Sequence, residues 1–282
     1  MNIEQLLQTY TQRLKATDIP SARLDCLILL EDATGKDRAW LLAHPDHTLD
    51  NDMIAELDEK IVRRSSHEPL AYIRETSEFY GRSFYVDKHV LEPRPESEAI
   101  IDSLKNIAHK LPENPIIIDI GTGSGALAIT AKLELPTATV YGTDIDPTCL
   151  VVAQRNAAQL AMTVTFIQAD LLQQSEIPIL PTPDVVLANL PYVPNDFSIN
   201  QAADHEPRLA IFGGPDGLDL YRKMFDQISQ IEQSEESGPK AFPRYVITEA
   251  LPPHHAQLAV IAEKAGYKLQ SATGFVQVFA RA

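Results

Sequence analysis

The chain has 282 residues, enough for one large domain or two smaller ones. Hydrophobic residues make up 44% of it and charged residues 22%, as in ordinary globular proteins, and the formal net charge of −15 excludes a general attraction to nucleic-acid backbones. It has only two cysteines, Cys26 and Cys149, which argues against a disulfide framework and for a reducing compartment.

The first ten residues, MNIEQLLQTY, lack the basic start and the apolar centre of a signal peptide. No charge-free run approaches the length that spans a membrane. We therefore expect a cytoplasmic protein with no membrane partner. None of the eight histidines stands in a metal-ligand pattern with cysteines or acids, so we predict no metal site.

Residues 2–66 carry apolar side chains at helical spacing, as in Leu6, Leu7, Tyr10 and Leu14. This pattern predicts a small all-α domain of about four or five helices. It fits either a packing extension or a module that recognises a partner.

Phe79, Tyr80 and Phe84, which lie around Gly81, predict a β-hairpin, and prolines at positions 93 and 95 predict a connector. We place the domain boundary in this region. The predicted organisation is a helical bundle over residues 1–75, a β-hairpin linker over 76–95 and a larger α/β domain over 96–282.

Beyond the hairpin, a helix is predicted at 96–110, and strand and helix patterns then alternate. Strands are predicted at 116–120, 138–143, 163–168, 183–188 and 243–249, with two more within 267–281, and helices at 124–134, 147–160, 216–232 and 253–265. This alternation predicts a doubly wound, mostly parallel sheet, in which ligands bind beyond the carboxyl ends of the strands. The polar stretch Gln233 to Lys240 predicts a mobile loop.

The stretch IIIDIGTGSG, residues 116–125, predicts a buried strand that runs into a tight turn and a helix. Glycine allows a ligand to approach the backbone closely and allows a positive φ. Gly121, Gly123 and Ala126 also satisfy the dinucleotide pattern G-x-G-x-x-G/A, with Asp144 near the spacing of a ribose-binding acid. The turn alone therefore fits a nicotinamide or flavin site, an S-adenosylmethionine site, or glycines kept only for packing.

Three acids, Asp119, Asp144 and Asp170, each close a predicted strand. Because the carboxyl ends of parallel strands share one edge of a sheet, the three carboxylates should converge there. They could cap helices, as Asp146 before Pro147 is expected to do, but we favour contact with a ligand, and a cationic ligand would gain most.

The next strand ends in Asn189-Leu190-Pro191-Tyr192, which puts a planar amide, a stiffened turn and an aromatic ring at the same edge. Enzymes that methylate a planar nitrogen need such groups, because the nitrogen lone pair is delocalised and must be held in one geometry. Nicotinamide enzymes have no evident need for them. This stretch therefore favours a methyltransferase.

At this point the sequence resembles the Asn-Pro-Pro-Tyr class of S-adenosylmethionine-dependent methyltransferases, specifically the glutamine-N5 methyltransferases of class-I peptide chain release factors (the PrmC or HemK family). The resemblance rests on LLAHP at 41–45, EPLAYI at 68–73, the FYG hairpin, LEPRPESE at 91–98, DIGTGSG at 119–125, GTDID at 142–146, NLPYVP at 189–194 and EPRLAIFGGPDGLDLYR at 206–222. It implies a Rossmann-like class I methyltransferase fold behind an N-terminal bundle that recognises the substrate.

For the cofactor, the resemblance implies a site for S-adenosylmethionine, with S-adenosylhomocysteine as product. The glycine turn would wrap the methionine part through Gly121, Thr122, Gly123, Ser124 and Gly125. Asp119 would lie near the amino group and Asp144 would accept from both ribose hydroxyls. Asp170 and Leu171 would border the adenine.

For the substrate, the resemblance implies the glutamine of a Gly-Gly-Gln loop in a release factor. The Asn189 side-chain oxygen and the Leu190 carbonyl would accept from its amide, and Asn189 would also border the cofactor. Pro191 would stiffen the turn and Tyr192 would pack beside the amide, while Arg94 and Pro95 would contribute to substrate binding.

Position 190 departs from the family pattern, because it is Leu where the family usually has Pro, and Asn-Leu-Pro-Tyr is common in rRNA adenine dimethylases. The alternatives are therefore an N6-adenine methyltransferase acting on DNA or rRNA, a ribosomal-protein glutamine methyltransferase, and a cofactor-binding scaffold without catalysis. The net charge of −15 argues against a nucleic-acid partner.

Overall fold

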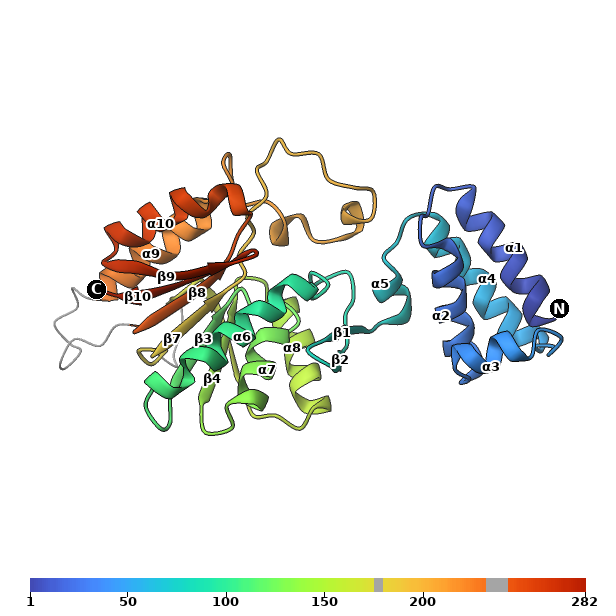
Figure 1. Ribbon diagram of the computed structural model, residues 1–282, viewed down its shortest axis with the longest axis horizontal. Helices are drawn as coiled ribbons and strands as arrows, with labels where there is room; N and C mark the ends of the chain where they lie inside the picture. The colour runs from blue at the N-terminus through green and yellow to red at the C-terminus, as the bar shows by residue number, and fades with distance from the viewer. Residues whose placement is uncertain (175–179, 232–242) are drawn as a thin grey trace. The chain divides into compact units, whose positions relative to one another are not determined.

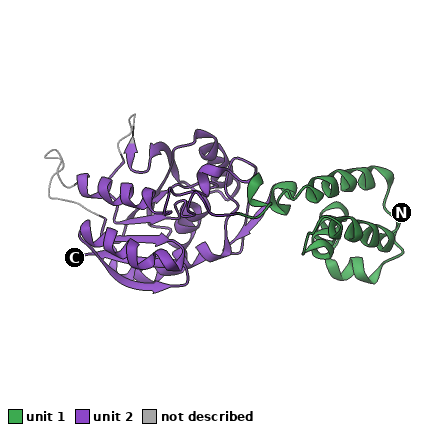
Figure 2. Ribbon diagram, turned by 90° about the horizontal axis from the view of Figure 1, so that it is seen from above, with its two compact units in different colours: residues 1–75, 199–205 green, residues 76–198, 206–282 purple. Residues whose placement is uncertain are grey.

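A computed structural model describes residues 1–174, 180–231 and 243–282 of the chain. The stretch Gln233 to Lys240 lies outside the described residues. The chain divides into two compact units, which Figure 2 distinguishes by colour: residues 1–75 with 199–205, and residues 76–198 with 206–282.

The first unit contains five α-helices: α1 Ile3–Lys15, α2 Ala22–Thr34, α3 Arg38–Ala43, α4 Asn51–Ser65 and α5 Leu70–Arg74. The first helix begins with a capping box, in which Asn2 Oδ1 accepts from the Gln5 amide at 2.9 Å and Gln5 Oε1 accepts from the Asn2 amide at 3.1 Å. Its apolar stripe is buried in the core of this unit. The predicted helical character of this region is confirmed.

The second unit begins with a hairpin of β1 Ser77–Phe79 and β2 Arg82–Phe84. Tyr80 and Gly81 form the two-residue turn with φ of 52° and 69°, the left-handed pair that matches the twist of a tight hairpin. Next come the short 3-10 turn η1 Pro95–Ser97, α6 Glu98–Ile107 and η2 Ala108–Lys110. The helix predicted at 96–110 is therefore α-helical only in its middle.

One eight-stranded sheet forms the second unit, in the order β6-β5-β4-β3-β7-β8-β10-β9. The bounds are β3 Ile116–Ile120, β4 Thr139–Asp144, β5 Thr165–Asp170, β6 Gln173–Gln174, β7 Val185–Ala188, β8 Tyr245–Glu249, β9 Tyr267–Thr273 and β10 Val276–Arg281. Strands β5, β4, β3, β7 and β8 pair in parallel, while β6, β10 and β9 are antiparallel. The predicted doubly wound sheet is confirmed, and β10 inserts between β8 and β9.

Helices cover both faces of this sheet, as Figure 1 shows. They are α6, α7 Ala126–Glu134 and α8 Pro147–Gln159 on one face, and α9 Asp219–Ile231 and α10 His255–Lys264 on the other. The 3-10 turns η4 Arg208–Ala210 and η5 Pro252–His254 belong to the same unit, whereas η3 Ala203–His205 belongs to the first. Asp146 caps α8 as predicted, because its Oδ1 accepts from the Thr148 amide at 2.8 Å.

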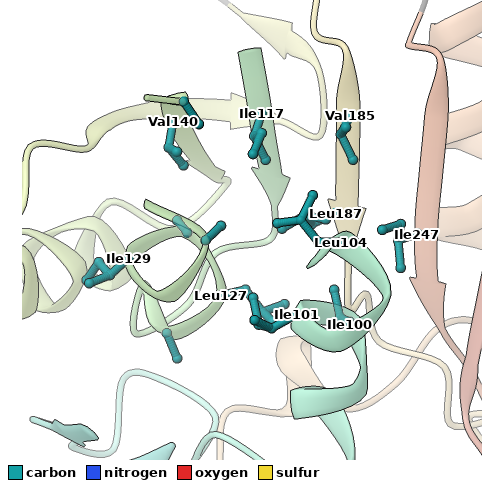
Figure 3. Packing of buried hydrophobic residues seen from close by; sticks show 14 of the residues in the cluster. Ile100, Ile101, Leu104, Ile117, Leu127, Ile129, Val140, Val185, Leu187 and Ile247 are labelled. Atoms are coloured by element: carbon teal, nitrogen blue, oxygen red, sulfur yellow. The ribbon is translucent and has the colours of Figure 1, made fainter. Parts of the chain in front are cut away.

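Successive side chains of a strand point to opposite faces of the sheet, so the buried strand β3 contributes side chains to two hydrophobic cores. Ile117 packs with α6 and α7 against Leu104 and Leu127, as Figure 3 shows. Ile118 belongs to the second core, with Phe225 of α9. Two packed layers hold the parallel strands in register, so their carboxyl ends meet at one edge.

Candidate active site

A cavity opens at the carboxyl ends of the parallel strands, where the sequence predicts ligand contact. Its wall includes residues 121–124, 144–146, 169–171 and 189–191 from the strand ends, residues 91–94 before α6, and Pro207, Leu209 and Ala210. All of these belong to the second compact unit. The cavity therefore brings together most of the predicted cofactor residues and the start of the Asn-Leu-Pro-Tyr stretch.

The glycine turn uses its glycines in two different ways. Gly123 has φ of +52° and a Cβ there would meet no atom within 4 Å, so its backbone lies open to the cavity. Gly125 has φ of +80° and does not line the cavity; a Cβ there would come within 3.1 Å of the Ala153 Cβ atom. Gly123 thus suits close approach by a ligand, whereas Gly125 lets α7 pack tightly against α8.

Asp119 lies beneath the turn and does not line the cavity. Its Oδ2 accepts from the Thr122 hydroxyl at 2.6 Å and from the Ala128 amide at 3.2 Å, which caps α7 from the strand end. Its Oδ1 is buried with no hydrogen-bond partner among the described residues, and complete burial raises the pKa of this carboxyl to about 7. Contact between Asp119 and a cofactor stays a prediction.

Asp144 lines the cavity and holds the glycine turn in place. Its Oδ2 accepts from the Gly123 amide at 2.9 Å and its Oδ1 from the Asp146 amide at 3.0 Å. Burial raises the pKa of this carboxyl, and the two amides partly oppose the shift. The carboxylate edge that faces the cavity can accept hydrogen bonds from a diol.

Asp170 and Leu171 form the neighbouring part of the wall. The Asp170 carboxylate pairs with the Lys223 ammonium of α9, and the Leu171 carbonyl accepts from the buried Thr143 hydroxyl at 2.9 Å. Leu171 adopts a left-handed conformation with φ of 61°, which turns the chain away from β5. The apolar Leu171 side chain therefore lies beside the anchored Asp170 carboxylate. Together they form a wall that suits a flat heterocycle.

Asn189 lines the cavity directly after β7. Its Nδ2 donates to the Ser97 hydroxyl oxygen at 2.8 Å. Within the described parts of the chain, the structure gives its Oδ1 no hydrogen-bond donor. The nitrogen end of the amide is therefore anchored, and the oxygen end is available to a ligand.

The rest of the motif divides between the cavity and the support behind it. Leu190 and Pro191 line the cavity, and the Leu190 carbonyl accepts from the Tyr221 hydroxyl at 3.1 Å. Tyr192 does not line the cavity, since its hydroxyl donates to Glu249 Oε1 at 3.0 Å. Its predicted packing beside a substrate amide stays a prediction.

Arg94 lines the cavity and pairs with the buried Glu206, whereas Pro95 only begins η1 and does not reach the wall. Burial raises the pKa of the Glu206 carboxyl, and the Arg94 guanidinium opposes that shift. The two segments with the most distinctive motifs, LEPRPESE and EPRLA, thus meet at the cavity through one ion pair.

Ser97, Tyr221 and Glu249 are site residues that the sequence patterns did not indicate. Glu249 is only 1% exposed and ends β8, next to the strand that carries Asn189. Burial raises the pKa of its carboxyl, and hydrogen bonding by Ser97, Tyr192 and Asn189 lowers it. Like the three acids considered above, Glu249 closes an apolar strand, YVITE, and that signal could have identified it.

None of the helices in the described ranges has the length and apolarity that a membrane crossing needs. Over the same ranges, no group of three or more histidine, cysteine or acidic side chains could hold a metal ion.

Comparison with known proteins adds family information to this geometry. A family model described as the PrmC N-terminal domain matches residues 5–74, and a model described as Ribosomal protein L11 methyltransferase (PrmA) matches residues 100–191. A release factor glutamine methyltransferase of Koribacter versatilis is 38% identical over 235 residues, which cover 81% of each chain. One of Moorella thermoacetica is 38% identical over 226 residues, 79% of this chain and 78% of that one.

Among solved structures, the hMettl16 catalytic domain in complex with MAT2A 3'UTR hairpin 1 is similar with a TM-score of 0.54. It is 14% identical and the match covers 83% of this chain and 81% of that chain. At this level of identity the likeness shows the fold alone.

Proposed function

This chain belongs to the family of release factor glutamine methyltransferases, and from that premise we propose that it transfers a methyl group from S-adenosylmethionine to N5 of the glutamine in the Gly-Gly-Gln loop of class-I peptide chain release factors. The observation that carries this proposal is the Asn189 amide, whose nitrogen is held by Ser97 and whose oxygen remains available at the cavity wall beside the glycine turn.

The residues of the cavity fit the proposed cofactor. The backbone at Gly123 is open to the cavity, as a bound methionine chain requires, and Asp144 offers carboxylate oxygens to the two ribose hydroxyls. Leu171 and the neighbouring Ile145 provide apolar surface for adenine. Bound S-adenosylmethionine would supply an electrophilic methyl group on a positively charged sulfur.

The chain's own contribution is to orient the acceptor amide. Asn189 Oδ1 and the Leu190 carbonyl, which has a second lone pair besides the one facing Tyr221, are two acceptors for the two N–H groups of a glutamine side chain. Pro191 limits the freedom of the turn. With both N–H groups engaged, the nitrogen is directed at the methyl carbon, so positioning and electrostatics supply the catalysis. The amide proton becomes acidic only as the new C–N bond forms, and it leaves afterwards.

The N-terminal unit is the proposed site of release factor recognition. It consists of small packed helices and matches the PrmC N-terminal domain model over residues 5–74. The net charge of −15 suits a protein partner better than a nucleic acid, and steric access by an extended protein loop needs no basic surface.

The proposed function is tested by incubating the purified chain with S-adenosylmethionine and a class-I release factor, followed by mass spectrometry of the tryptic peptide that contains Gly-Gly-Gln. The expected result is the gain of one methyl group on the glutamine. Parallel reactions with adenine-containing RNA or DNA and with ribosomal proteins test the alternatives. A gain on one of these, with none on the release factor, would refute the proposed substrate.

A further inference from the structure

The side-chain amide of an asparagine has two ends of almost the same shape. A half-turn about its Cβ–Cγ bond exchanges the oxygen and the nitrogen with little steric cost, but it exchanges an acceptor for a donor. In the proposed reaction only the oxygen end of Asn189 can accept from the glutamine amide. Some neighbouring group must therefore determine which end faces the cavity.

Ser97 contacts the nitrogen end, since Asn189 Nδ2 donates to the Ser97 oxygen at 2.8 Å. A hydroxyl group can donate as well as accept, so Ser97 alone would also tolerate the reversed amide. Ser97 is 3% exposed, which leaves bulk water little part in the choice. The hydroxyl proton needs a fixed acceptor elsewhere.

We take Glu249 as that acceptor, because it ends β8 beside the end of β7, and because both Ser97 and Asn189 act on its carboxylate. When ionised, a carboxylate only accepts hydrogen bonds. Burial raises the pKa of Glu249, and hydrogen bonding by Ser97, Tyr192 and Asn189 opposes that rise by stabilising the ionised form. The Tyr192 hydroxyl donates to Oε1 at 3.0 Å, while Oε2 is buried with no hydrogen-bond partner within the described residues and can accept a further proton donor. If Ser97 directs its proton to this carboxylate, its oxygen can only accept from Asn189.

The backbone around Glu249 is tied to the same motif. The buried Tyr221 hydroxyl contacts both the Leu190 carbonyl and the main-chain carbonyl of Glu249. The end of β8 and the turn after β7 are thus held together, which keeps the carboxylate at a constant position relative to Asn189.

We propose that Glu249, acting both directly and through Ser97, is a positioning residue that fixes the polarity of the Asn189 amide, so that its oxygen faces the methyl-accepting group. This proposal rests on the proposed function, because it assigns the support of the same acceptor. It requires no contact between Glu249 and either substrate.

The test uses Glu249→Gln, Ser97→Ala and the double variant in the full chain, with methylation of a release factor as the assay. A glutamine at 249 keeps the size and the acceptor for Tyr192, but its NH2 group can donate to Ser97 and so permit the reversed amide. Each single variant should lower kcat by about tenfold, the effect of one misplaced hydrogen bond. Affinity for S-adenosylhomocysteine, measured by calorimetry, should stay within about twofold.

The double variant tests whether Ser97 and Glu249 act as one unit. Once Glu249 is replaced, Ser97 no longer has a fixed acceptor for its proton, so adding Ser97→Ala should change kcat little further and the double variant should resemble Glu249→Gln. Ser97→Thr keeps the hydroxyl and should retain most of the activity. Glu263→Gln, an exposed acid of α10, is the matched control and should behave as the unaltered chain.

Three results would overturn the inference: an unchanged kcat in Glu249→Gln, losses that multiply in the double variant, or a parallel loss of S-adenosylhomocysteine affinity, which would indicate a general structural role. If the unaltered chain transfers no methyl group to a release factor, the proposed function fails and the inference fails with it.

Discussion

Arg94 and Glu206 lie 112 residues apart in the chain, yet Arg94 Nη2 lies 2.7 Å from Oε1 and 2.5 Å from Oε2 of Glu206. The Glu206 side chain is 3% exposed and the Arg94 side chain 39%. The pair joins the loop before α6 to the segment that begins with Glu206, and both border the cavity. Arg94 therefore supplies a counter-charge to the buried Glu206, and the pair holds two segments of the cavity wall together.

Replacing Arg94 with methionine should destabilise the fold, because Glu206 would keep its burial and lose its partner. We expect the free energy of unfolding to fall by about 1–3 kcal/mol, less than for a fully buried pair because solvent reaches Arg94. Urea unfolding measures this change. Adding Glu206→Gln should restore part of the loss; a double variant as unstable as Arg94→Met would contradict this explanation.

The Asn189→Ala variant should lose turnover and keep its cofactor site. The variant removes an acceptor for the substrate amide, so we expect kcat to fall by about a hundredfold or more. Affinity for S-adenosylhomocysteine should change little, because the glycine turn and Asp144 are intact. Calorimetry and the methylation assay together measure both quantities, with the exposed Asn114→Ala as control. An equal loss of both would instead assign Asn189 to cofactor binding.

Asp144→Asn should weaken binding of S-adenosylhomocysteine by about tenfold or more, since a neutral amide offers one acceptor where the carboxylate offers two charged ones. In the unaltered chain, affinity should fall as the pH is lowered and Asp144 gains a proton. Because burial raises the pKa of this carboxyl, that fall should begin at a higher pH than for an ordinary aspartate.

Calorimetric titrations across pH would check both effects of Asp144. In Asp144→Asn, the affinity for S-adenosylhomocysteine should no longer fall as the pH is lowered. In the control Asp52→Asn, which replaces an exposed residue, it should still fall. A variant that binds as tightly as the parent would remove Asp144 from the ribose site.

Asp119 should make stability depend on pH near neutrality. Its pKa is about 7 in the folded protein against an ordinary value of 3.8, so the folded state holds the proton more tightly than the unfolded chain does. The Asp119 contribution is therefore most favourable below pH ~4 and is lost as the pH rises through ~7, with a decline of about 3 kcal/mol between pH 5 and pH 8.

The Asp119→Asn variant should lack this decline, because an amide can accept from Thr122 and Ala128 without carrying a charge. Urea unfolding at pH 5 and pH 8 compares the two chains. Parallel pH profiles for the parent and the variant would show that Asp119 does not titrate in this range.

The local sequence determined the elements and the broad chemistry of the site. The run of β-branched residues predicted β3, and the three closely spaced glycines predicted the turn before α7. The acid at each strand end predicted the carboxylates at one edge of the sheet, and each of these signals acts over only a few residues. The same holds for Asn189 and the proline-stiffened turn after β7. These signals are local because strand propensity, positive φ and helix capping are set by adjacent residues.

Only the tertiary structure decided what holds these groups in place and which of them face the cavity. Sequence patterns alone did not assign Asp119 to the buried side of the turn, Gly125 to helix packing, or Tyr192 to Glu249. Ser97 lies 92 residues from Asn189, and Glu249 lies 57 residues from Tyr192. Such pairs depend on the order of strands in the sheet and on how deeply each side chain is buried, which no short stretch of sequence specifies.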